Sequence, residues 1–173
     1  MKVIIFIIGV IVALLVVAYF LPRETTIQEE IMINKPEAQV WNYVKYIKNQ
    51  ENYSVWVMAD PNRKLEYIGT DGTVGFIAKW DSEMKSVGKG EQEIKDIIPN
   101  KRMDVEIRFE KPFKGTSQAS TEVATGAEKR TKVVTTFKST AKYPMNLMSF
   151  FMQKALKGQM QETLTNLKNV LEK

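Results

Sequence analysis

The start of this chain carries no charged residue between Val3 and Leu21, and the only charges close to this run are Lys2 and Arg23. As an α-helix the run would extend roughly 28 Å, close to the ~30 Å hydrocarbon core of a bilayer. A helix that is apolar on every face is stable only inside a protein core or inside a membrane. A chain of this size cannot bury a terminal helix of this length in its own core, which leaves the membrane. The run is therefore predicted to enter a membrane.

Two fates are compatible with this run. A signal peptide would be cleaved after Ala18, where the residues satisfy the small-residue rule. An uncleaved anchor is favoured, because the run exceeds the ~7–15 apolar residues of a typical signal region and continues through Phe20. Lys2 precedes the run and Glu24 neutralises Arg23, which places the N-terminus in the cytoplasm and the rest of the chain outside. A lipoprotein is excluded, since there is no cysteine to acylate.

The composition removes several kinds of chemistry at once. The chain contains no histidine and no cysteine, which excludes structural zinc sites, cysteine nucleophiles, histidine bases, haem ligation by histidine and disulfides. We therefore expect no metal and no cofactor. The net charge of +5 is spread without a block of like charges, which favours a solvated basic surface over nucleic-acid binding. Attraction to anionic lipid headgroups is the alternative for a domain held at a membrane.

The remaining residues suffice for one domain, with 22–26 as a short linker and 27–173 as the folded part. Alternation predicts a first strand over Thr26–Ile33. A helix capped by Asn34 follows, and a second short helix or packed loop surrounds Trp56. Period-two alternation then predicts six strands, separated by turns that include Asp71-Gly72. These strands cover 65–68, 74–80, 90–98, 102–110, 116–125 and 131–140.

The last element is a long helix over 146–172, with one apolar stripe from Met148 to Leu171. The strand over 102–110 alternates most clearly, so it has one buried face and one solvated face, as in an antiparallel sheet. The order of elements predicts an α+β domain in which the sheet wraps around the long helix.

The run from Ile31 to Trp41, IMINKPEAQVW, resembles the opening of the START, birch-pollen-allergen and polyketide-cyclase superfamily (SRPBCC). In that superfamily a strand ends in Asn-x-Pro and enters a helix with Val-Trp or Val-Phe. Residues 110–116, 143–145 and 167–171 resemble a membrane-anchored bacterial branch of it. The resemblance implies a helix-grip fold, a curved antiparallel sheet around the C-terminal helix with a hydrophobic cavity between them. It implies no particular ligand, because members differ widely in function.

The strand and helix phases select side chains that would line this cavity. Three of them, Gln92, Thr121 and Thr135, are polar, and they either orient a ligand headgroup or bond to sheet carbonyls or water. The helix methionines suit a groove for varied apolar guests, and equally an ordinary core. The predicted lining is Trp56, Phe76, Trp80, Gln92, Ile94, Met103, Val105, Ile107, Phe109, Ala119, Thr121, Thr135, Phe137, Met148, Met152, Leu156 and Met160.

No catalytic residues are predicted, since no carboxylate pair suits acid–base catalysis and Glu29 is the only carboxylate in phase with an apolar row. The hypothesis is a membrane-tethered domain that binds a small apolar or amphipathic, lipid-like molecule without turning it over. Two alternatives stay open. One is a cyclase or dehydratase type of enzyme, which needs an inward ionisable group beside a sizeable pocket. The other is a ligand-free module that regulates a membrane partner, which needs a filled core.

Overall fold

The computed structural model describes residues 2–126 and 130–173, which form one long apolar helix and an α+β domain. The sheet is antiparallel and seven-stranded, in the order β1-β7-β6-β5-β4-β3-β2. Its strands are β1 (Glu24–Ile33), β2 (Lys64–Ile68), β3 (Ile77–Asp81), β4 (Lys89–Ile98), β5 (Arg102–Lys111), β6 (Gly115–Thr125) and β7 (Thr131–Thr140). The helices are α1 (Lys2–Phe20), α2 (Glu37–Val44), the 3-10 helix η1 (Ile47–Asn52), α3 (Val55–Met58) and α4 (Asn146–Glu172).

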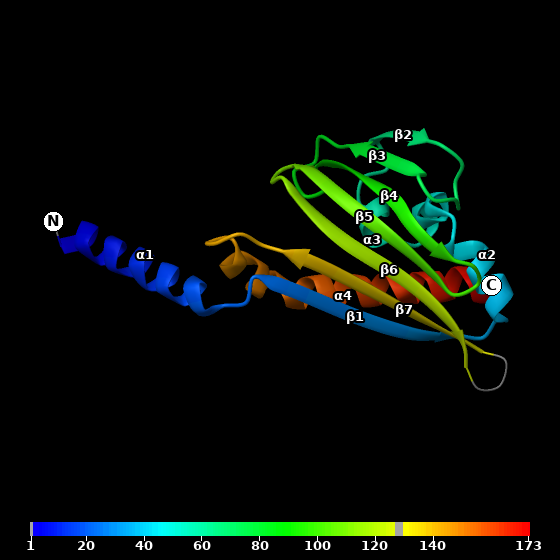
Figure 1. The fold of residues 1–173 in the computed structure, drawn as a ribbon. Helices are drawn as coiled ribbons and strands as arrows, with labels where there is room; N and C mark the ends of the chain where they lie inside the picture. Colours follow the sequence, from blue (N-terminus) through cyan, green and yellow to red (C-terminus); the bar gives the residue numbers. More distant parts are fainter. Residues whose placement is uncertain (1, 127–129) are drawn as a thin grey trace.

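The sheet curves around α4, while α1 extends away from the domain (Figure 1). Helix α4 packs mainly against the edge strand β1. Glu24 pairs with Thr140, so the start of β1, the end of β7 and the start of α4 all lie at the end of the domain where α1 enters. This arrangement is the helix-grip fold that the order of sequence elements predicts. Helix α1 is long and apolar enough to cross a membrane, and nearly all of its side chains are exposed.

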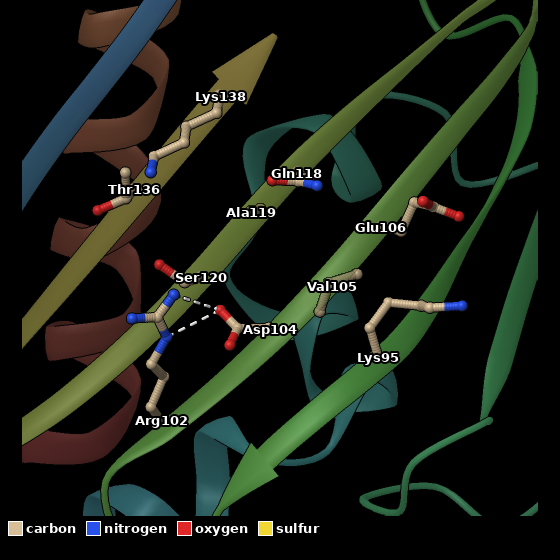
Figure 2. A pocket seen from close by; sticks show the side chains of 10 residues that line it. All are labelled: Lys95, Arg102, Asp104, Val105, Glu106, Gln118, Ala119, Ser120, Thr136 and Lys138. Atoms are coloured by element: carbon tan, nitrogen blue, oxygen red, sulfur yellow. Dashed lines mark hydrogen bonds and ion pairs between the residues drawn. The ribbon is translucent and has the colours of Figure 1, made fainter.

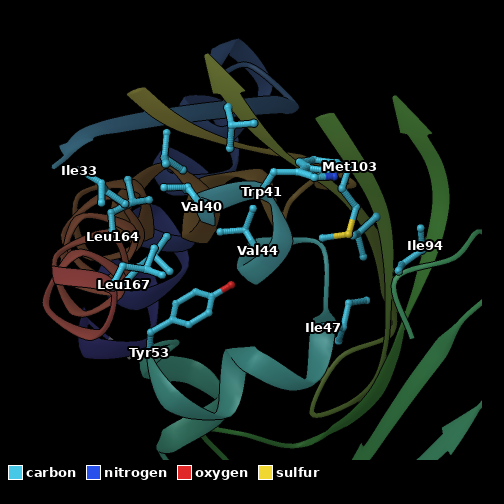
Figure 3. Close-up of a cluster of buried hydrophobic side chains, with 14 of the residues drawn as sticks. Ile33, Val40, Trp41, Val44, Ile47, Tyr53, Ile94, Met103, Leu164 and Leu167 are labelled. Atoms are coloured by element: carbon cyan, nitrogen blue, oxygen red, sulfur yellow. The ribbon is translucent and has the colours of Figure 1, made fainter. Parts of the chain in front are cut away.

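The hydrophobic core fills the half of the domain that lies far from α1. Helix α2 contributes Val40, Trp41 and Val44, which lie between α4 and the concave face of the sheet (Figure 3). Their spacings of one, three and four residues place them on one face of the helix. The other fully buried members come from the sheet, from η1 and from the second half of α4, and include Ile33, Ile47, Ile94, Met103, Val133, Leu164 and Leu167.

Most predicted boundaries agree with the structure, but the start of the second helix was predicted wrongly. Helix α2 begins at Glu37, and Pro36, not Asn34, occupies its N-cap position without a side-chain cap. The backbone N–H of Asn34 instead donates to the Glu172 carboxylate at the C-terminal end of α4, 2.6 Å away. Asn34 therefore lies two residues too early to cap, and its backbone contact joins two elements that are remote in sequence.

The turn predicted at Asp71-Gly72 belongs to a longer connection. Strands β2 and β3 do pair antiparallel, but β3 begins only at Ile77, so residues 74–76 precede the strand. The Asp71 carboxylate accepts the N–H groups of Ile47 and Lys48, at 2.9 and 3.0 Å. These are the first residues of η1, so Asp71 satisfies helical donors that have no partner within the helix. At the other end of the domain, β1 starts at Glu24, and three residues of the expected linker lie in the sheet.

We predict that Ile94→Ala lowers the free energy of unfolding by about 2–5 kcal/mol, because it opens a cavity at a fully buried position. The neighbouring Lys95→Ala removes only an exposed ion pair with Glu93 and should cost less than about 1 kcal/mol. Urea unfolding of the full chain in detergent micelles, followed by tryptophan fluorescence, measures both. Equal midpoint shifts would contradict the assigned phase of β4.

Candidate functional site

The concave face of the sheet is built from alternate residues of neighbouring strands. Ala119 on β6 lies opposite Val105 on β5 and Phe137 on β7. One pair further toward α1, Ile107 lies opposite Ser117 on β6 and Gln92 on β4. Because side chains alternate between the two faces of a strand, the register brings these residues together on one face with the core residue Met103.

The predicted cavity residues divide into those that fill the core and those that solvent reaches. Phe76, Ile94, Met103, Val105 and Met160 are buried. The second group is partly or largely exposed, although it lies in the same rows. It comprises Trp56, Trp80, Gln92, Ile107, Phe109, Ala119, Thr121, Thr135, Phe137, Met148, Met152 and Leu156.

The exposed apolar part of the concave face lies toward α1. Phe109 is close to the end of β5 and Phe137 close to the end of β7, and both strands end on the α1 side of the sheet. Trp80 packs edge-on against Phe109, with ring centroids 6.1 Å apart. Gly90 leaves the space for this ring, since a Cβ there would come within 2.7 Å of the Trp80 indole. We refer to the row Ile107, Phe109, Ala119 and Phe137 as the open concave row.

The first half of α4 does not cover this row. From Met160 onward its apolar stripe is buried, through Leu164, Leu167 and Leu171. Earlier in the helix Met148 and Met152 are 41% and 47% exposed. Their spacing of four residues places them on one face. Gln153 belongs to a different face and donates to the Thr25 hydroxyl on β1, at 3.4 Å. The methionine side of α4 is therefore left unpacked.

Two side-chain bridges mark the boundary between the core and the open part. The Trp56 indole N–H donates to the Gln159 side-chain oxygen at 3.0 Å, which ties α3 to the middle of α4. The Gln92 amide donates to the Gln50 side-chain oxygen at 3.1 Å, which ties η1 to β4. The amide predicted to orient a ligand headgroup is thus bonded to another side chain.

Three ionisable groups of the domain, Glu29, Tyr67 and Asp60, have an ion-pair partner or a pKa shift that does not suit acid–base chemistry at neutral pH. The Glu29 carboxylate pairs with the Lys157 ammonium at 3.4 Å. Burial, and the hydrogen bond that its hydroxyl donates to Glu51, raise the pKa of Tyr67 to about 12. Asp60 is a buried carboxylate that no sequence pattern indicates, and hydrogen bonds from the Ser82 hydroxyl and the Asn62 N–H lower its pKa. A carboxylic acid that acts as a general acid needs the opposite shift.

A separate depression of about 360 Å³ lies on the convex face of the sheet (Figure 2). Of the predicted cavity residues, only Val105 and Ala119 border it. Arg102 pairs with Asp104 at 2.8 Å and with Glu122 at 3.2 Å, so the guanidinium charge is compensated within the sheet. This depression is charged and open, unlike the apolar row on the other face. It is lined by Lys95, Arg102, Asp104, Val105, Glu106, Gln118, Ala119, Ser120, Thr136 and Lys138.

A third feature joins α1 to the domain. The Asn146 amide, at the first residue of α4, donates to the carbonyl oxygens of Ala18 at 2.6 Å and Leu21 at 3.1 Å. The last carbonyls of a helix have no partner within it, so Asn146 caps the C-terminal end of α1 from a distance of 125 residues or more along the chain. Asn146 and Ala18 are each 1% exposed. The sequence offered one signal, an amide at the start of an otherwise apolar helical turn, but not its partner.

The fold and the apolar concave row define a helix-grip protein. Solved structures with this fold include truncated norcoclaurine synthase from Thalictrum flavum, with 12% identity and a TM-score of 0.62 over 86% of this chain and 93% of that one. A protein from Mesorhizobium loti, MLL2253, has 15% identity and a TM-score of 0.62, over 86% and 97% of the two chains. Ara h 8.0201 has 15% identity and a TM-score of 0.57, over 86% and 97%. At these identities the likeness shows the fold alone.

The family model described as polyketide cyclase / dehydrase and lipid transport matches residues 24–172. The chain belongs to this family, which confirms the superfamily that the sequence motifs indicate. No curated protein is significantly similar to the chain in sequence. The family suggests a domain that binds a hydrophobic ligand or resembles a polyketide cyclase.

We predict that Asn146→Ala frees α1 from the domain, because the two carbonyls lose a buried donor, at a cost of about 1–3 kcal/mol. In limited proteolysis of the full chain in micelles, a protease that cleaves after Arg23 should then cut this variant faster than the wild type. Asn169→Ala, an exposed position on the same helix, is the matched control. Unchanged cleavage in Asn146→Ala would show that this contact does not hold the junction.

Proposed function

We propose that this protein is a membrane-tethered domain that binds a small hydrophobic or amphipathic, lipid-like molecule on its concave face and does not transform it. One observation carries the proposal. The open concave row is apolar and partly exposed, and the apolar side chains of Met148 and Met152 are exposed at the same end of the domain. Exposed apolar surface of this kind is costly in water and typical of a ligand site.

The tether is α1, retained as a membrane anchor, with the domain outside the cytoplasm. Its length and composition support this role. The contact with α4 adds to it, because the bond at which a signal peptidase would cleave follows Ala18, a buried residue that Asn146 holds. Only residues 21–23 separate α1 from β1, so the domain stays within about 10 Å of the end of the helix. Lipids are the apolar molecules most abundant at that position.

The chemistry of the concave face supports a role without turnover. The chain has no histidine or cysteine. The Glu29 carboxylate is paired with a lysine, and the high pKa of Tyr67 leaves its phenol protonated at neutral pH. Neither group is therefore placed to activate a nucleophile or to remove a proton. A binding role requires only the apolar surface, which the open concave row supplies.

Ala119→Trp places a large ring in the middle of the open concave row, so we expect it to weaken the affinity for a fatty acid at least about tenfold, or ~1.4 kcal/mol in binding free energy. Native mass spectrometry of the full chain, released from micelles after titration with oleic acid, measures the one-to-one adduct. The matched control is Gln118→Trp, which puts the same ring on the convex face of the same strand.

Equal adducts in both variants would show that oleic acid binds elsewhere. If the wild type forms no adduct with oleic acid or with a phospholipid, the ligand-free interaction module replaces this proposal. Circular dichroism of both variants checks that the sheet is intact.

A further inference from the structure

We infer that the turn between β7 and α4, together with the first two turns of α4, lies in the headgroup layer of an anionic bilayer and forms a second membrane contact besides α1. We call residues 141–154 the α4 entry surface. The inference rests on the proposed membrane attachment of α1. It goes further, because a tether alone would let the domain stand off the lipid surface.

The hydrogen bonds to α1 set the depth of this surface. The Tyr143 hydroxyl donates to the Leu15 carbonyl at 3.3 Å. Leu15 precedes Phe20, the last residue of α1, by five residues, which is about 8 Å along the helix axis. The α4 entry surface therefore lies beside the last turn and a half of α1. If α1 spans a bilayer, Tyr143 reaches at least the headgroup depth at which tyrosine is enriched.

Most of the exposed side chains of this surface are large and apolar. Phe151 is 71% exposed, and Phe150 is 46% exposed. They follow Asn146 by four and five residues, so they lie at most about 8 Å beyond the end of α1, within a headgroup layer that is roughly 5–8 Å thick. Met145, Met148 and Met152 are exposed around them. Aromatic and other large apolar residues in this position are typical of interfacial helices.

The charge of the segment fits an anionic lipid surface. Residues 141–161 contain three lysines, Lys142, Lys154 and Lys157, and no acidic residue. Lys157 pairs with Glu29 on β1, whereas Lys142 and Lys154 are exposed among the apolar residues. Cations beside large apolar side chains bind anionic headgroups while those side chains enter the acyl boundary.

This contact would place the ligand site at the membrane. The open concave row and the α4 entry surface lie at the same end of the sheet, and Met148 and Met152 belong to both the unpacked side of α4 and this surface. A lipid can then move between the bilayer and the concave face without crossing water. The surface thus supplies a route for the ligand as well as an anchor.

The absence of native cysteine allows a direct test. The full chain with Phe151→Cys is labelled with an environment-sensitive NBD probe and reconstituted into nanodiscs of phosphatidylcholine and phosphatidylglycerol. Phe150→Cys is the second position. Ile98→Cys, an exposed apolar residue at the opposite end of the sheet, is the control. We expect brominated lipids to quench the probes at 150 and 151 and to leave the probe at 98 unquenched. Lys142→Gln with Lys154→Gln should reduce quenching at 151 in these discs but not in discs of phosphatidylcholine alone.

The other outcomes contradict either this inference or the proposed membrane attachment. Protein that enters the discs but shows equal, water-like emission at 98, 150 and 151 overturns the inference and leaves the tether intact. Protein that fails to enter the discs contradicts the proposed function instead. A third outcome is a probe at 151 that is shielded from water without being quenched by brominated lipids, to a degree that increases with the number of protein copies per disc. That result assigns the surface to a contact with a second copy and also overturns the inference.

Discussion

The long C-terminal helix is gripped over only half of its length, and the rest of the structure depends on this asymmetry. From Met160 to Leu171 the apolar stripe of α4 is buried against the sheet and α2. Before Met160 the helix is held at its edge by β1 and at its start by the contact between Asn146 and α1. The buried second half of α4 is part of the hydrophobic core, whose burial stabilises the fold. The first half can therefore remain unpacked without loss of the fold.

Because the first half of α4 is unpacked, apolar surface that a domain in water normally buries stays partly exposed. The apolar residues of β5, β6 and β7 that would contact a fully gripped helix are partly exposed, and they lie at the end of the domain where α1 enters. Ordinary selection against exposed apolar surface does not apply in the same way beside a lipid bilayer, because there the surface has a partner other than water. The position of α1, the proposed anchor, and the partial exposure of the concave face therefore support each other.

The sequence predicts the fold well for reasons that are local. Strict alternation in β5 and an uninterrupted helical stripe in α4 leave little choice of element type, and α4 has the predicted bounds. The predictions fail where a distant partner decides. Helix α2 begins at Glu37 and not beside Asn34, whose backbone N–H bonds to Glu172. Asp71 does occupy the predicted turn, but its carboxylate also accepts the first N–H groups of η1, a contact that its sequence neighbours do not indicate.

For the site, periodicity identifies which residues face inward, but it does not show how much of that face is covered. Phe76 and Phe109 follow the same rule, yet Phe76 is buried by the core while Phe109 is partly exposed near α1. The neighbours of Asn146 mark it as an amide in an apolar helical turn but do not indicate its partners, which are the Ala18 and Leu21 carbonyls. Coverage depends on the path of α4 across the sheet, which is a tertiary property.

The central claim is that a lipid-like molecule occupies the concave face near α1. Photocrosslinking with a diazirine fatty acid in membranes that contain the full chain tests it most directly. The account predicts crosslinked peptides from the ends of β5 and β7 and from the first two turns of α4, which carry Phe109, Phe137 and Met148. Crosslinks confined to α1, with none in these three segments, would contradict it.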